Sequence, residues 1–134
     1  MFPDMEVRWE NRSKVVAESR YVQYIDAIQE KSIGSIRPDV TLTRAGDADP
    51  LLIEIHVAHA VDDQKVRALK KIGFPCIEVN VRSALTGDGF DRTELERILI
   101  HSKDPGYKRW LCFPNEDSYI AKLKTEVLAE RNAA

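Results

Sequence analysis

Two carboxylates, Asp39 and Glu54, lie on either side of a turn that we expect to bring them together. Residues 36–43 and 51–58 each read as a strand, and residues 44–50 (RAGDADP) between them have the composition of a turn. In an antiparallel hairpin centred on the glycine and the following aspartate of this turn, Asp39 lies opposite Glu54, with Cβ atoms roughly 5 Å apart. Two like charges at that spacing favour a cation between them, and a hard divalent ion with oxygen ligands fits best.

The side-chain alternation of these expected strands separates a polar face from an aliphatic face. Asp39 shares its face with Arg37, and Glu54 shares its face with His56. The opposite faces carry Val40, Leu42, Ile53, Ile55 and Val57. We therefore expect Val40 and Ile53 to face the core, and the acids and the histidine to share one polar patch. Each residue also has an ordinary interpretation, since Pro-Asp is a common turn dipeptide and Glu54 suits a half-exposed strand.

A lysine on the next helix is a third candidate. Residues 62–72 have an amphipathic pattern that Gly73 ends, with apolar positions at Val66, Leu69 and Ile72. Lys65 lies about 40° from Leu69 at 3.6 residues per turn, which places it inside the apolar stripe. Its ammonium is expected either to reach Asp39 and Glu54 or to extend along apolar surface into water.

The remaining elements frame this hairpin and helix. Residues 76–81 read as a strand, which completes a β-α-β unit with parallel strands. Met5, Val7 and Trp9 alternate as in a short strand, whereas residues 13–19 suit a helical turn. Residues 21–31 fit a helix or a strand. Two later helices are expected at 91–102 and 117–131, joined by a loop.

The composition limits the class of protein. A chain of 134 residues and 15.3 kDa fits one domain. Its 43% hydrophobic and 31% charged residues are ordinary for a soluble globular protein, and a net charge of −2 argues against a protein that coats nucleic acid. We expect no membrane span, because there is no apolar run near 18 residues, and no secretory signal. Cys76 and Cys112 provide no disulfide framework, which favours a cytoplasmic location.

Three segments together resemble the PD-(D/E)xK nuclease superfamily, and more narrowly its bacterial competence-protein-CoiA-like members. They are IRPDVTL (36–42), LLIEIHVAHAVDDQK (51–65) and FPCIEVNV (74–81). The resemblance covers about residues 20–82, and RWLCFPN (109–115) is weakly similar to the end of such proteins. It implies one α/β domain of α+β-like character with a restriction-endonuclease-like core, a mixed sheet of four or five strands flanked by helices, and a C-terminal helical extension over 83–134.

The resemblance also implies roles for individual residues. Asp39 and Glu54 match the motif acids, which hold Mg²⁺ or Mn²⁺. His56 stands where the motif lysine is usually found, two residues after the glutamate, and Lys65 looks like the migrated lysine of variant members. His59 matches the histidine that precedes their helix.

A third acid is left open between two residues. The resemblance favours a strand over residues 21–31, and a turn at Gly34 and Ser35 then places Glu30 opposite Asp39 as a further metal ligand. If residues 21–31 are a helix, Glu18 is the acid on its apolar side.

The activity implied by the resemblance is metal-dependent hydrolysis of phosphodiester bonds in single- or double-stranded DNA, with a homodimer left open. His56 would accept a proton or touch phosphate. The expected backbone contacts are Arg37, His59, Lys70 and Lys71. The alternatives are a catalytically inactive nucleic-acid-binding or protein-interaction module on the same fold, and a small zinc protein that uses His56, His59 and a carboxylate.

Overall fold

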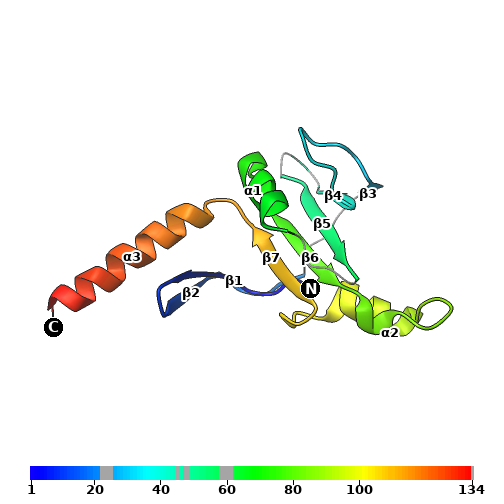
Figure 1. The fold of residues 1–134 in the computed structure, drawn as a ribbon. Coiled ribbons are helices and arrows are strands. Elements are labelled where there is room, and N and C mark those ends of the chain that lie inside the picture. The colour runs from blue at the N-terminus through cyan, green and yellow to red at the C-terminus, as the bar shows by residue number, and fades with distance from the viewer. Residues whose placement is uncertain (22–25, 45, 47–48, 58–61, 134) are drawn as a thin grey trace.

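A five-stranded mixed sheet organises the chain in the computed structural model, which describes residues 1–21, 26–44, 46, 49–57 and 62–133 (Figure 1). Its strands, in spatial order, are β3 (Asp26–Gln29), β4 (Val40–Thr43), β5 (Leu51–His56), β6 (Cys76–Asn80) and β7 (Lys108–Cys112). Only the β5–β6 pair is parallel. The expected mixed α/β architecture with helices beside the sheet is confirmed.

The hairpin of β4 and β5 has the predicted register. Val40 pairs with Ile53 in an antiparallel ladder, so continuing the ladder by one residue sets Asp39 opposite Glu54. Pro38 is fully buried and precedes β4, where a missing N–H does not interrupt the ladder.

The segment before the Pro-Asp dipeptide is extended rather than helical over its described part. β3 pairs antiparallel with β4, and the Glu30 amide donates to the Asp39 carbonyl at 3.0 Å. Glu30 is therefore level with Asp39, as the strand alternative predicts. Residues 22–25 lie outside the described part of the chain.

Helix α1 (Asp63–Ile72) covers the face of the sheet that carries Glu54. The Asp62 side chain caps its first turn by accepting from the Lys65 amide at 2.8 Å, and Gly73 ends it with φ of 84°. Its Leu69 packs in a buried cluster with Ile36, Leu52, Cys76, Leu111 and Cys112. The expected polar face is thus apolar in part, because α1 buries Leu52 on it.

The opposite face is covered by the segment after β6. A short 3₁₀ turn, η1 (Arg82–Ala84), leads to α2 (Arg92–Glu96), which continues into a π-helical segment, η2 (Arg97–His101). Ile98 packs there against Leu51, Ile77, Val79, Val81 and Ala84, with Ile53 beside them. The helix expected over 91–102 is confirmed, and Ile53 faces this core as predicted.

Two strands contradict the sequence-based expectations. Residues 13–19 lie mostly in a strand, β2 (Arg12–Ala17), which pairs with β1 (Met5–Trp9), so the helical turn expected there is wrong. The loop expected after residue 102 contains β7, which pairs with β6. β2 forms by pairing with the short strand β1, and β7 forms by pairing with β6, which is distant in the sequence. A local sequence pattern does not reveal either pairing.

The β1–β2 hairpin and α3 (Glu116–Ala133) form a unit beside the main sheet. In Figure 1, α3 extends away from the five strands with the hairpin alongside it. Val7, Phe113, Leu123 and Val127 are buried together between them. In the described residues, no helix is long and apolar enough to cross a membrane.

Lys108 begins β7 and is almost completely buried. Its Nζ donates to the carbonyl oxygens of Met1 at 2.7 Å and Leu99 at 2.9 Å. Burial lowers the pKa of this ammonium from 10.5 to about 8. The side chain therefore joins the start of the chain and η2 to the edge of the sheet.

Candidate active site

Glu54 is the centre of the candidate site. It is 3% exposed, and its Oε2 accepts from the Lys65 Nζ at 2.9 Å. Its Oε1 is buried and has no hydrogen-bond partner in the described residues. The pKa of the carboxyl is raised chiefly by burial, opposed by Lys65, and raised further by the nearby Asp39 carboxylate.

Asp39 is held against the neighbouring strand. Its Oδ2 accepts from the Ile55 amide at 2.7 Å, which fixes the carboxylate at the start of β4 beside β5. The influence of Asp39 on the Glu54 pKa and the shared register both place the two acids together, as the sequence predicts.

Lys65 reaches this pair from above the sheet. It lies in the first turn of α1, its stem is partly covered, and its ammonium contacts Glu54 as the helical phase predicts. Its ammonium hydrogen-bonds Glu54 rather than Asp39. Lys65 thus provides a counter-charge for the buried Glu54 carboxylate, whose burial without one would destabilise the folded state.

Glu78 is a member of this layer that the sequence interpretation missed. The parallel register of β5 and β6 sets Glu78 beside Glu54, and it is nearly fully buried. Its Oε1 accepts from Arg109 Nε at 2.9 Å, across the β6–β7 pair. The signal was present, since both strands contain an Ile-Glu pair followed by an aliphatic residue.

His56 is turned toward Glu78 instead of Glu54. Its Nδ1 lies 3.8 Å from the Glu78 Oε1, and the ring is mostly covered. It lines a pocket of about 200 Å³ with Glu78, Asn80, Arg109 and the segment 105–108. His56 therefore lies two residues after Glu54 on β5, but its ring lies near Glu78 of the neighbouring strand β6, whereas Lys65 contacts Glu54.

Glu30 and Arg37 pair with each other at the surface. Arg37 Nε donates to the Glu30 carbonyl at 2.7 Å, and its terminal nitrogen lies 3.8 Å from Glu30 Oε2. Glu30 has a positive φ of 50°, which breaks the strand alternation and explains why its exposed side chain meets Arg37. Glu18, the alternative acid, is exposed after β2.

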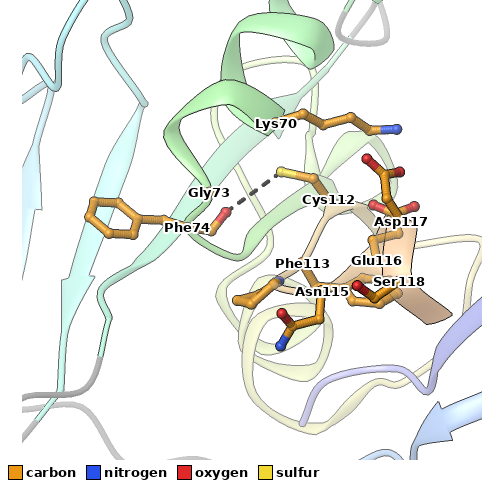
Figure 2. A pocket seen from close by; sticks show the side chains of 10 residues that line it. Lys70, Gly73, Phe74, Cys112, Phe113, Asn115, Glu116, Asp117 and Ser118 are labelled. Atoms are coloured by element: carbon orange, nitrogen blue, oxygen red, sulfur yellow. Dashed lines mark hydrogen bonds between the residues drawn. The ribbon is translucent and has the colours of Figure 1, made fainter.

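The expected backbone-contact lysines do not lie with Lys65. Lys70 lines a pocket of about 320 Å³ at the end of α1, with Cys112, Glu116 and Asp117 around it (Figure 2). Burial raises the Glu116 pKa there, and Lys70 opposes the rise. Lys71 is exposed, and His59 lies outside the described residues.

The carboxylates of Asp39 and Glu54 are ligands of the kind that hold a hard divalent cation, whereas His59 of the zinc alternative lies outside the described residues. Mg²⁺ is commonly held by one or two carboxylates with waters and substrate phosphate completing its shell, and Asp39 with Glu54 supplies that minimum. Zinc prefers three or four histidine, cysteine or carboxylate ligands. Across the described ranges, no group of three or more such residues is placed to hold a metal.

Comparisons with family models, with curated proteins and with solved structures find no match to this chain.

Proposed function

We propose that this protein is a metal-dependent nuclease of the PD-(D/E)xK type, hydrolysing phosphodiester bonds of DNA on a restriction-endonuclease-like core. The observation that carries the proposal is Glu54. A carboxylate that is 3% exposed, with one oxygen on Lys65 and the other without a partner in the described residues, is expensive unless it binds something. A cation shared with Asp39 would use that oxygen.

Each residue has a defined part in this chemistry. Asp39 and Glu54 would hold Mg²⁺ or Mn²⁺, which when bound polarises the phosphodiester and lowers the pKa of a coordinated water. The Ile55 amide and the Lys65 ammonium keep the two carboxylates oriented. Lys65 would also stabilise the negative charge that develops on the scissile phosphate.

A catalytically inactive nucleic-acid-binding module is the second candidate, and one observation favours it. His56 replaces the strand lysine and faces Glu78, so Lys65 is the cation that contacts Glu54. In this interpretation the Lys65–Glu54 pair is a structural ion pair, and DNA binds without being cleaved.

Cleavage of labelled single- and double-stranded DNA in Mg²⁺, Mn²⁺ or EDTA separates the two candidates. We expect cleavage that requires the metal and is abolished in Glu54→Gln. The matched control is Glu126→Gln, because Glu126 is an exposed carboxylate paired with Lys14 at 3.2 Å, far from the site. DNA binding without cleavage in either metal would reject the nuclease and favour the binding module.

A further inference from the structure

The Arg109 guanidinium is bound through its Nε to Glu78, which leaves its two terminal nitrogens facing outward. Its Nε donates to Glu78, and the side chain is 53% exposed. Within the described residues, its two terminal nitrogens donate no hydrogen bond. A guanidinium anchored in this way keeps an outward pair of N–H donors with the geometry that matches two phosphate oxygens.

His56 approaches the same carboxylate from the neighbouring strand. Its Nδ1 lies 3.8 Å from the Glu78 Oε1 atom that Arg109 also contacts. Glu78 is nearly fully buried and cannot itself face an incoming anion; its Oε1 accepts from Arg109 Nε and lies close to the His56 ring.

The space between these groups has the volume of a small anion. The pocket lined by His56, Asn80 and Arg109 holds about 200 Å³, roughly seven water volumes at about 30 Å³ each. One phosphate group with a few waters fits this volume. The segment 105–108 forms the remaining wall.

The pocket lies directly beside the candidate active site. Glu78 and Glu54 are register partners on adjacent parallel strands, which lie about 4.8 Å apart. A nucleic-acid backbone crossing the carboxyl ends of these strands would pass from Glu54 and Lys65 to Arg109.

We propose that this pocket is a phosphate subsite, in which the outward N–H groups of Arg109 and the ring of His56 bind a backbone phosphate next to the scissile one. Glu78 is a positioning residue for both. The identity of the ligand as nucleic-acid backbone rests on the proposed nuclease function, whereas the affinity of the pocket for phosphate does not.

Two probes test the subsite in the full chain without metal. Inorganic phosphate is titrated while the ring protons of His56, assigned with His56→Gln, are followed by NMR. The affinity for a fluorescent single-stranded oligonucleotide is measured in EDTA. We expect a saturable His56 shift, and Arg109→Leu should weaken both phosphate and oligonucleotide binding about tenfold, since charge-assisted hydrogen bonds are lost.

Arg12→Leu is the matched control. Arg12 is 46% exposed, close to the exposure of Arg109, and pairs at 2.7 Å with the exposed Glu130 of α3, so the change removes the same charge from a surface pair between β2 and α3. It should leave phosphate binding and oligonucleotide affinity within about twofold of wild type, because an exposed ion pair on another part of the molecule contributes little energy. Arg109→Lys retains a cation for Glu78 if Arg109→Leu fails to fold, and it should still weaken binding because an ammonium lacks the planar pair of donors.

The outcomes separate this proposal from the nuclease. An unchanged His56 response in the folded Arg109 variants would overturn the subsite, even if metal-dependent cleavage is present. Unchanged oligonucleotide affinity would also overturn it as a backbone contact. Phosphate binding that depends on Arg109, in a protein that cleaves nothing, would support the phosphate pocket and reject only the nuclease.

Discussion

Lys65 approaches the acids from a helix, and this position determines what its removal should do. Its ammonium contacts a buried carboxylate, and in the proposed nuclease it would also stabilise the scissile phosphate. Lys65→Ala should therefore reduce metal-dependent cleavage by about 10²–10³-fold, the usual cost of removing one transition-state donor. DNA affinity should fall much less, because one phosphate contact is a small share of backbone binding. Cleavage rates and oligonucleotide affinity measured in parallel check this.

The control for Lys65 lies on the same helix. Arg67 is exposed on α1, so Arg67→Ala removes a charge without touching Glu54 and should preserve the cleavage rate. If cleavage is unchanged in Lys65→Ala, the lysine has only a structural role and His56 becomes the next residue to test.

The sequence predicted the residues whose positions follow from local periodicity. Asp39, Glu54 and Lys65 were found because a short hairpin and a single helix fix their register and phase. Glu78 was missed because its place beside Glu54 depends on how β6 aligns with β5 after a helix has intervened. The repeated Ile-Glu pair suggests a matching role, but only the parallel pairing of β5 with β6 places the two carboxylates side by side.

Two strands, β7 and β2, were the hardest elements to predict, because their residues show no clear apolar alternation. β7 starts with Lys108 and Arg109 and lies among loop-forming residues, so it reads as a loop until β6 provides its partner. β2 has four exposed residues in succession, and its pairing with β1 outweighs any local helical preference. Tertiary contact decides both segments.

The buried lysine of β7 should make stability depend on pH. The Lys108 pKa is lowered from 10.5 to about 8, so between these pH values the unfolded chain binds more protons than the folded chain. Lys108 therefore increases the free energy of unfolding as the pH rises from about 8 to 10.5, by about 3 kcal/mol at most.

In Lys108→Met, this pH-dependent increase in the free energy of unfolding should be absent. Urea unfolding at several pH values from 7 to 10.5 should show that wild type becomes more stable relative to Lys108→Met as pH increases. The exposed Lys122 provides the control, since Lys122→Met should follow the wild-type pH profile. Parallel profiles for wild type and Lys108→Met would contradict the lowered pKa.

At the scale of the whole molecule, the unit formed by α3 and the β1–β2 hairpin depends on a separate apolar cluster. Leu123 is 4% exposed within it, whereas Leu128 on the same helix is 39% exposed. Leu123→Ala should lower the free energy of unfolding by about 2–5 kcal/mol, because it leaves a cavity. Leu128→Ala should cost less than about 1 kcal/mol.

Denaturant unfolding of both variants measures this difference. The Lys65–Glu54 contact lies on the other unit, so the folded Leu123→Ala protein should keep the cleavage rate of wild type. Equal destabilisation by the two leucine substitutions would show that the helix does not pack on the hairpin through Leu123.

The pairing of the first hairpin with the last helix has a consequence for synthesis on the ribosome. Arg12 and its partner Glu130 are separated by 118 residues, so the hairpin leaves the exit tunnel roughly ten seconds before the helix that covers it. A lone two-stranded hairpin is marginally stable in water. Throughout that interval Val7 and its apolar neighbours lack the cover that residues 116–133 provide in the folded chain, so this surface stays exposed longer than the five-stranded sheet does.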